Sequence, residues 1–307
     1  MSEQRDLTKG LCIYHGGCTD GVAAAWAVWS RFPEWQFYPG VYQQEPPWEL
    51  IDAVQDVWLV DFSYKRAVIE KMAERARVHV LDHHRTARDD LAPLFEADVI
   101  HGKFDMERCG AMLAWDWFHY GSPRPALLEH IDARDRWITP RPRDNDPIVM
   151  ALRSHWHAVG AGAAPDWPAL MQRWSLLMRA AQLSKLATEG YAILRYFRQR
   201  VEETKPHATT MSLGPLEDVP VVNAPYYLAS EVAGELAADS PSGIAAVWWA
   251  NKDGSVTFSL RSRGEFDVGE LATQYGGGGH PGAAGFRMGP PIHGLPPDPE
   301  AECPEAP

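Results

Sequence analysis

Short apolar segments alternate with helical patterns in the first half of the chain. Strands are predicted at residues 11–14, 57–61 and 78–82, and helical spacing follows at 22–32 and 65–76. Strands this rich in apolar residues are typical of a sheet buried on both faces. We therefore predict a parallel sheet covered by helices, with ligands binding outside the carboxyl ends of its strands.

The second half of the chain carries a further strand and helix pattern. Strands are predicted from the run VPVVNA near Val219 and from IAAVWWA and VTFSLRS, with a helix at 230–238. The last two runs are separated by Asn-Lys-Asp-Gly at 251–254, which is typical of a hairpin turn. A long helical pattern at 167–203 precedes them and connects the halves.

The predicted fold class is α/β, with two domains and a cleft between them. Pro, Arg and Asp are concentrated at 140–147, which marks a boundary or an exposed loop. The expected order is an N-terminal parallel-sheet domain (1–160), a helical connector (161–212), a smaller C-terminal α/β domain (213–288) and a disordered Pro-rich tail (289–307).

Charge and composition narrow the classes of partner. Among 307 residues, 41 acidic side chains outnumber 29 basic ones, giving a net charge of −12. Binding along a long nucleic-acid duplex needs many Lys and Arg contacts, so the charge disfavours it and leaves short phosphorylated substrates. The four cysteines form no C-x-x-C pair, and no apolar run is long enough to cross a bilayer. We expect a cytoplasmic protein that does not bind membranes.

Histidine and carboxylate residues gather where the predicted strands end. They are His15 to Asp20 in YHGGCTDG, Asp61, the run Asp82-His83-His84, and Asp132 with Asp135. Each group alone has a structural explanation, such as a turn, a helix cap or a solvated helix face. Together they favour divalent cations of the manganese, iron, cobalt or zinc group. Two such ions bridged by one carboxylate can activate water and hold a phosphoryl group.

A glycine run marks the second domain. Gly276 to Gly279 precede His280, and backbone N–H groups of such a run can form an anion-binding concavity. Arg261, near the end of a predicted strand, can hold a terminal phosphate in a bidentate fork.

These motifs, in this order, resemble the DHH phosphoesterase superfamily, which includes RecJ-like exonucleases, nanoRNases, cyclic-dinucleotide phosphodiesterases and family II pyrophosphatases. The run SLRSRGEFDVGELATQYGGGGHPGAAGF is similar to the glycine-rich motif of its DHHA1 substrate-binding domain. The resemblance extends from about Cys12 to Phe286 and implies a metal-dependent phosphoesterase.

The resemblance also implies residue roles. Asp61 would bridge two metals, Asp82 would orient a neighbouring histidine, and His84 would contact the substrate phosphate or assist proton transfer. Asp20, His83 and either Asp135, which we favour, or Asp132 would complete one metal site, and His15 would join Asp61 at the other. On the substrate side the implied residues are Arg261, Gly277, Gly278, Gly279 and His280.

The first motif departs from the family pattern His-x-Asp-x-Asp-Gly. This chain has one extra residue, and Cys18 stands two before Asp20, where the family usually has an Asp ligand. A thiolate suits zinc or iron better than manganese. Whether Cys18 ligates a metal is left open, and the His15 site is expected to bind its metal more weakly than the neighbouring site.

The expected function is hydrolysis of short single-stranded oligonucleotides to nucleoside monophosphates with two divalent metals, Mn²⁺ first, and Zn²⁺, Co²⁺ or Fe²⁺ because of Cys18. The alternatives are a cyclic-dinucleotide or nucleoside 3′,5′-bisphosphate phosphohydrolase and a non-catalytic nucleotide-binding family member. A homodimer paired through the helical connector is a further expectation.

Overall fold

The computed structural model describes residues 10–42, 44–136, 146–156 and 166–289. The chain divides into two units, Met1–Arg195 and Tyr196–Pro307, each with its own sheet. Most of the predicted loop at 140–147 and the predicted tail from residue 290 onward lie outside the described residues.

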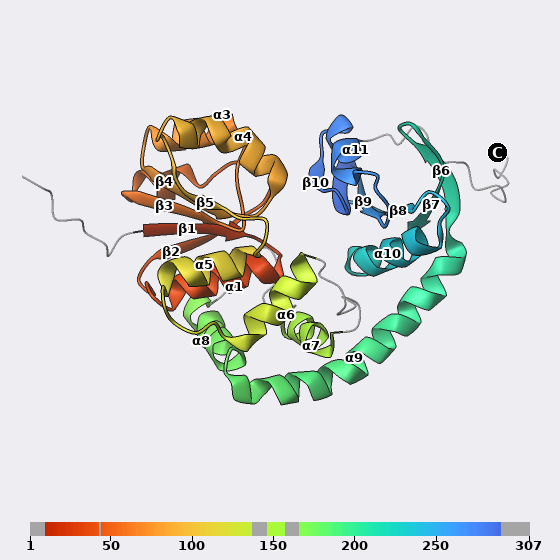
Figure 1. Cartoon of the computed structure of the whole chain (residues 1–307), viewed down its shortest axis with the longest axis horizontal. Helices are drawn as coiled ribbons and strands as arrows, with labels where there is room; N and C mark the ends of the chain where they lie inside the picture. Colours follow the sequence, from red (N-terminus) through yellow and green to blue (C-terminus); the bar gives the residue numbers. More distant parts are fainter. Residues whose placement is uncertain (1–9, 43, 137–145, 157–165, 290–307) are drawn as a thin grey trace, which may run out of the picture. The chain divides into compact units, whose positions relative to one another are not determined.

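The first unit contains a five-stranded parallel sheet, as the apolar runs predicted (Figure 1). Its strand order is β2-β1-β3-β4-β5. The strands are β1 (Gly10–His15), β2 (Gln36–Gly40), β3 (Asp56–Val60), β4 (Arg77–Asp82) and β5 (His101–Phe104). Strands β2 and β5 were not predicted, because QFYPG contains a proline and HGKF has only four residues.

Helices cover both faces of this sheet, and Figure 1 shows α1 and α5 on one face and α3 and α4 on the other. Side chains alternate along β1, so that Cys12 and Tyr14 pack into one core while Leu11 and Ile13 pack into the other. The helices are α1 (Thr19–Trp29), α2 (Trp48–Asp52), α3 (Arg66–Ala73), α4 (Arg85–Glu96), α5 (Gly110–Phe118), α6 (Ala126–Asp135), α7 (Pro147–Trp156) and α8 (Trp167–Leu177).

The strand order places a switch in direction beside β1. The chain moves from β1 to β2 on one side and then returns to β3 on the other side. In sheets of this kind, ligands bind where the order reverses, outside the carboxyl ends of the strands. The carboxyl ends of β1, β3 and β4 are therefore where a site is expected, and they carry the polar clusters found in the sequence.

The helical pattern predicted at 167–203 is divided between two helices. Helix α8 ends at Leu177, a short turn η3 (Ala180–Gln182) follows, and α9 runs over Leu183–Thr204. Met178 and Leu186 are both buried in the same core of the first unit. The break lets the chain turn so that apolar side chains on both sides of it are buried.

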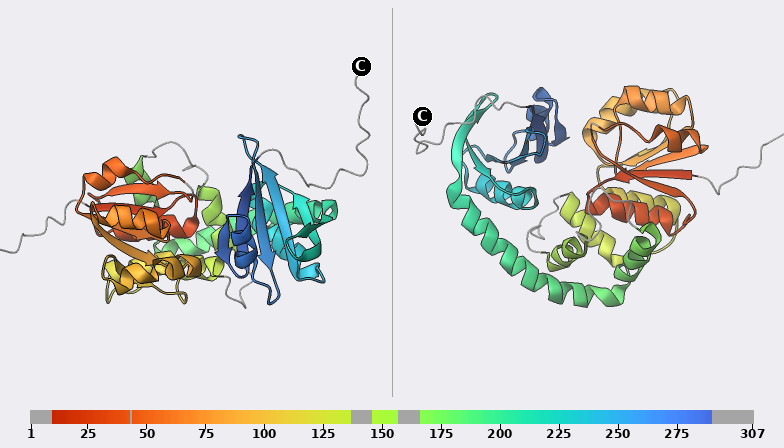
Figure 2. Two further views of the ribbon diagram at one scale, coloured as in Figure 1. Left: turned by 90° about the horizontal axis from the view of Figure 1, so that it is seen from above. Right: turned by 180° about the vertical axis from the view of Figure 1, so that it is seen from behind.

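The second unit holds a mixed six-stranded sheet of order β10-β11-β9-β8-β7-β6, in which only β7 and β8 are parallel (Figure 2). The predicted hairpin joins β8 to β9. The elements are η4 (Lys205–His207), β6 (Thr209–Leu213), β7 (Leu216–Asn223), η5 (Tyr226–Leu228), α10 (Ala229–Asp239), β8 (Ile244–Ala250), β9 (Val256–Ser262), α11 (Val268–Gln274), β10 (Gly278–His280) and β11 (Ala283–Met288).

The sheet of the second unit has a separate core on each face. Helix α11 packs with Phe258, Leu260 and Phe286 on one face, and α10 packs with Ala245 and Val247 on the other. Within the described residues of the whole chain, we find no helix long and apolar enough to cross a membrane.

Candidate functional site

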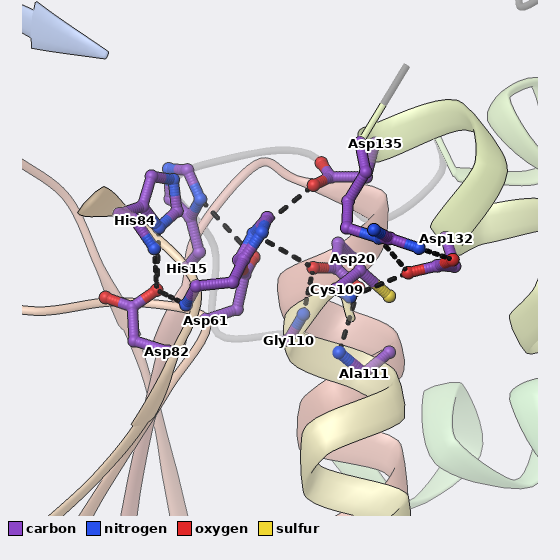
Figure 3. A network of polar contacts seen from close by, with 12 residues as sticks. His15, Asp20, Asp61, Asp82, His84, Cys109, Gly110, Ala111, Asp132 and Asp135 are labelled. Atoms are coloured by element: carbon purple, nitrogen blue, oxygen red, sulfur yellow. Dashed lines mark hydrogen bonds and ion pairs between the residues drawn. The ribbon is translucent and has the colours of Figure 1, made fainter. Parts of the chain in front are cut away.

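Histidine and carboxylate side chains from several elements of the first unit meet in one cluster (Figure 3). His15 ends β1, Asp61 directly follows β3, and Asp82 ends β4. The cluster, which we call the carboxylate–histidine centre, consists of His15, Cys18, Asp20, Asp61, Asp82, His83, His84 and Asp135. The ends of three parallel strands supply His15, Asp61 and Asp82, and helices α1 and α6 add Asp20 and Asp135.

Asp61 lies in the middle of this centre. Its Oδ1 is 3.1 Å from Nε2 of His83, and its Oδ2 is 3.5 Å from Nδ1 of His15. Asp61 is only 1% exposed and adopts a positive φ of 57°, a conformation that costs an L-residue roughly 1–2 kcal/mol. A Cβ added to Gly110 would lie 2.3 Å from Cβ of Asp61, so only glycine fits beside it. The fold thus holds the Asp61 carboxylate between two histidines, on a backbone in the left-handed region.

Asp20, His83 and Asp135 form the first group of ligand atoms, all within 4.8 Å of one another. Nε2 of His83 is 3.3 Å from Oδ2 of Asp135 and 3.7 Å from Oδ2 of Asp20. Asp20 also accepts hydrogen bonds from the backbone N–H groups of Gly110 and Ala111, at 2.7 and 2.9 Å. The start of α5 therefore fixes the Asp20 carboxylate and favours its negative charge.

His15, Cys18 and Asp61 form the second group, with the same spread of ligand atoms. Oδ2 of Asp61 is buried and has no hydrogen-bond partner among the described residues. A buried carboxylate oxygen without a donor is costly unless a cation neutralises it. Gly21 allows the close approach, since a Cβ there would lie 2.2 Å from the carbonyl oxygen of His15. The donor set and this oxygen fit a divalent cation.

Asp82 holds the second histidine of the Asp-His-His run. Its Oδ1 lies 2.6 Å from Nδ1 of His84 and accepts the backbone N–H of His83 at 2.7 Å. Its Oδ2 accepts the hydroxyl of Ser63 at 2.6 Å. These contacts fit the predicted role of Asp82 as the carboxylate that orients a neighbouring histidine.

The histidines and carboxylates of the centre shift one another's pKa values. Burial lowers the pKa of His83 and of His84, but the carboxylates beside them outweigh burial and raise both to about 9. Burial raises the pKa of Asp61, yet interactions with His15 and His83 hold it below its usual range. Burial and the Asp61 charge raise the pKa of Asp20. Cation binding would displace protons from such ligands.

Burial, together with the charges of Asp61 and Asp135, raises the pKa of the Cys18 thiol. A nearby cation is the one change that would reverse this effect, because a coordinated thiol loses its proton.

The structure separates the two aspartates between which the sequence analysis left a choice. Asp135 lies in the centre, whereas Asp132 does not: its carboxylate accepts the N–H of Cys109 at 2.7 Å and pairs with Arg136 at 2.7 and 2.8 Å. Asp132 therefore fastens the start of α5 to α6. Asp135 remains the predicted ligand.

Two predicted substrate-side residues, His280 and Arg261, lie on one row across the sheet of the second unit. His280 on β10 is opposite Ala283 on β11, which is opposite Arg261 on β9. Directly paired residues of antiparallel strands point to the same face, so the small Ala283 stands between the two basic side chains. Arg261 donates to the hydroxyl of Ser259 at 3.1 Å and to the carbonyl of Leu260 at 2.7 Å.

The glycine run has a structural explanation at two of its positions. A Cβ on Gly277 would lie 2.1 Å from the carbonyl oxygen of Gly285, and one on Gly279 would lie 2.6 Å from that of Ala283. Gly279 also has a positive φ of 146°. A Cβ on Gly278 would meet nothing within 4 Å. Packing thus explains Gly277 and Gly279, whereas the space beside Gly278, and beside Gly276 with its φ of 77°, is open to a ligand.

Residues 224–290 match the family model of the DHHA1 domain, and the Asp82-His83-His84 run lies in the first unit. The predicted resemblance is therefore confirmed for this part of the chain, where the DHHA1 match includes Arg261, the glycine run and His280.

A viral relative resembles most of the chain. An uncharacterized protein of Acanthamoeba polyphaga mimivirus is 26% identical over 298 residues, which is 90% of this chain. This chain spans 66% of the length of that relative.

Three solved structures align with most of this chain at low identity. An uncharacterized protein from Helicobacter pylori (16% identity, TM-score 0.47) covers 91% of this chain, and 93% of it is matched. RecJ in complex with Mn²⁺ from Thermus thermophilus is 16% identical, with a TM-score of 0.47. The alignment covers 91% of this chain and 49% of that chain. The pGpG-specific phosphodiesterase PggH from Vibrio cholerae is 15% identical, with a TM-score of 0.46. The alignment covers 92% of this chain and 93% of that chain. At TM-scores below 0.5, these similarities assign no functional residue.

Sequence reasoning missed several residues that shape the centre. The backbone N–H groups of Gly110 and Ala111 donate to the Asp20 carboxylate from 90 residues or more along the chain. The hydroxyl of Ser63 donates to Asp82. The exposed Tyr42 places its ring 5.3 Å from that of His15 and 6.4 Å from that of His84. The sequence carries no local signal for these contacts, because each depends on how distant segments pack.

Proposed function

We propose that this protein is a divalent-metal-dependent phosphodiesterase that hydrolyses short oligonucleotides to nucleoside monophosphates. The observation that carries the proposal is the position of Asp61, whose two oxygens face His83 and His15 in adjacent ligand groups. One carboxylate between two cations is the arrangement that two-metal phosphoryl transfer needs.

Each residue of the centre has a part in this proposal. Asp20, His83 and Asp135 would hold one cation, and His15 and Asp61 the other, with Asp61 shared. The bound cations would supply an activated water and neutralise charge on the phosphate oxygens. His84, held through Nδ1 by Asp82, would contact the phosphate or give a proton to the leaving oxygen.

The DHHA1 domain would bind a phosphate of the substrate. Arg261 and His280 flank the small Ala283 on one sheet face, so that an anion bound there would meet two basic side chains. The chain's net charge of −12 favours short substrates, because each added phosphate that no basic group neutralises increases the repulsion.

A substrate panel tests the proposal. Di- to pentanucleotides, cyclic dinucleotides, adenosine 3′,5′-bisphosphate and pyrophosphate would be incubated with Mn²⁺, Co²⁺, Zn²⁺ or Mg²⁺. We expect release of nucleoside monophosphates from the short oligonucleotides, with Mn²⁺ supporting turnover. His84→Ala should abolish the activity, whereas the control His101→Ala, at an exposed histidine that begins β5, should retain it.

Other outcomes separate the alternatives. Preferential cleavage of cyclic dinucleotides or of the bisphosphate would replace the oligonucleotide substrate but keep the phosphoesterase chemistry. Absence of hydrolysis with every substrate and metal, together with retained nucleotide binding, would contradict the proposal and favour a non-catalytic nucleotide-binding protein.

A further inference from the structure

The two ligand groups of the carboxylate–histidine centre differ in chemistry. Asp20, His83 and Asp135 offer one nitrogen and two oxygens, while His15, Cys18 and Asp61 offer a nitrogen, a sulfur and an oxygen. Oxygen-rich sets suit manganese, and adding a thiolate shifts preference toward zinc and other soft cations. Because the two donor sets differ, the two groups are expected to prefer different metals.

We propose that Cys18 is a metal ligand and that the His15–Cys18–Asp61 group selects a thiophilic cation of the zinc class. This inference rests on the proposed function only in that both place a metal in this centre. It assigns a sulfur donor to a position where the family resemblance implies an oxygen donor.

The oxygen atom at this group supports the inference independently of the cysteine. Oδ2 of Asp61 is buried, has no hydrogen-bond partner among the described residues, and is 3.5 Å from Nδ1 of His15. A cation bound beside this nitrogen and oxygen would neutralise the buried carboxylate oxygen. The sulfur of Cys18 is the third atom of the same group.

The backbone around Cys18 places its sulfur for this role. Cys18 is the N-cap of α1, with φ −112° and ψ 138°, and its side chain makes no capping hydrogen bond. The preceding turn is held by the hydrogen bond from Gly16 N to Gly40 O at 2.8 Å, and Gly17 has a positive φ of 73°. The extra residue in this motif is thus accommodated by two glycines, and the sulfur still reaches the ligand group.

The other described cysteines give a matched control. Cys12 and Cys109 are buried, and Cys12 packs in the core of the first unit with Tyr14. Cys12 belongs to none of the ligand groups found among the described residues. Replacing Cys12 removes a thiol from the same part of the chain without touching the group that is tested.

The experiment uses the full-length protein loaded with Co²⁺, kept in a non-thiol reductant. We expect a near-ultraviolet charge-transfer absorption, the signature of a thiolate bound to cobalt. Cys12→Ala should keep this absorption, and Cys18→Ser should lose it while still binding cobalt at the Asp20 group. In Cys18→Asp the ratio of Zn²⁺ to Mn²⁺ affinity should fall at least about tenfold, equivalent to 1.4 kcal/mol.

The outcomes distinguish this inference from the proposed function. Cobalt bound to the native protein without thiolate absorption would overturn the role of Cys18, while manganese-dependent hydrolysis would still support the phosphodiesterase. A thiolate absorption in a protein that hydrolyses nothing would support Cys18 as a ligand and contradict the enzyme. An unchanged zinc-to-manganese ratio in Cys18→Asp, with a native unfolding profile, would also overturn the inference.

Discussion

The carboxylate–histidine centre and the glycine hairpin (residues 276–288) were both found as motifs, but the structure gives them different kinds of support. In the centre, buried side chains converge, and Oδ2 of Asp61 has no hydrogen-bond donor among the described residues. In the hairpin, Gly277 and Gly279 already have a reason to be glycine, because β11 leaves no room for a side chain.

A motif residue indicates a bound ligand only where contacts within the polypeptide do not explain it. A buried polar atom without a partner is unfavourable by itself, so it indicates something absent from the polypeptide. A glycine against a neighbouring strand is explained within the fold, so it indicates nothing further. The metal side of the proposal therefore stands on stronger ground than the glycine contacts on the substrate side.

The largest effect is expected for Asp61→Asn in the carboxylate–histidine centre. The amide keeps the shape and tolerates the positive φ, but it cannot bridge two cations. We expect loss of the second bound metal and about a 10³-fold fall in kcat/KM, equivalent to about 4 kcal/mol of barrier. Metal counting and initial rates on a dinucleotide measure both effects.

Asp98→Asn is the matched control for this change. Asp98 has a φ of 55°, close to that of Asp61, but its side chain is exposed. The control should keep full activity and metal content. Full activity in Asp61→Asn would remove the bridging role and would leave the two regions equally unsupported.

In the glycine hairpin, the expected effects are on stability. Gly277→Ala should destabilise the DHHA1 domain by about 2 to 3 kcal/mol, because its Cβ would meet a backbone carbonyl at 2.1 Å. Gly278→Ala should stay within about 0.5 kcal/mol, because the space around it is open. Chemical denaturation followed by tryptophan fluorescence measures both.

The activity of Gly278→Ala then decides whether the hairpin binds substrate. A raised KM in a protein of native stability would show that a ligand approaches this glycine. Unchanged kinetics would leave the glycine run with a packing role alone and would assign the substrate contact to Arg261 and His280.

Much of the fold could be predicted because the deciding signals are local. The apolar runs of β1, β3 and β4 and the Asn-Lys-Asp-Gly turn before β9 each lie within a few residues. Strand β2 was missed because its burial depends on pairing with β1, not on its own composition. The break between α8 and α9 was missed because no proline or glycine marks it.

The site was predictable to the level of residue types at strand ends. Spacing alone could not choose between Asp132 and Asp135, because residues three apart share one face of a helix. The choice depends on Arg136 and the N–H of Cys109, which hold Asp132 away from the centre. The positive φ of Asp61 and its contact with Gly110 are likewise tertiary features.

A smaller effect, confined to the centre, is expected from pH. The pKa of His83 is about 9 and that of Asp20 is raised, so the apoprotein carries protons that a cation must displace. Metal affinity should therefore rise as pH increases toward 9, by about 1.4 kcal/mol per pH unit for each proton displaced. Calorimetry in two buffers of different ionisation enthalpy counts these protons; affinity independent of pH between 6 and 8 would contradict the charge balance.

The smallest expected effects come from two serines, one in each unit of the chain. Ser63→Ala removes the hydroxyl that Asp82 accepts at 2.6 Å, which should cost about 1 to 2 kcal/mol of stability. Because Asp82 orients His84, it should also lower kcat, by about tenfold at most. Ser259→Ala removes the acceptor of Arg261 at 3.1 Å and should raise KM instead. Steady-state kinetics of both variants separate the two effects. If Ser63→Ala changed KM and Ser259→Ala changed kcat, the division into a catalytic centre and a substrate-binding face would be reversed, because each serine acts only through the side chain it holds.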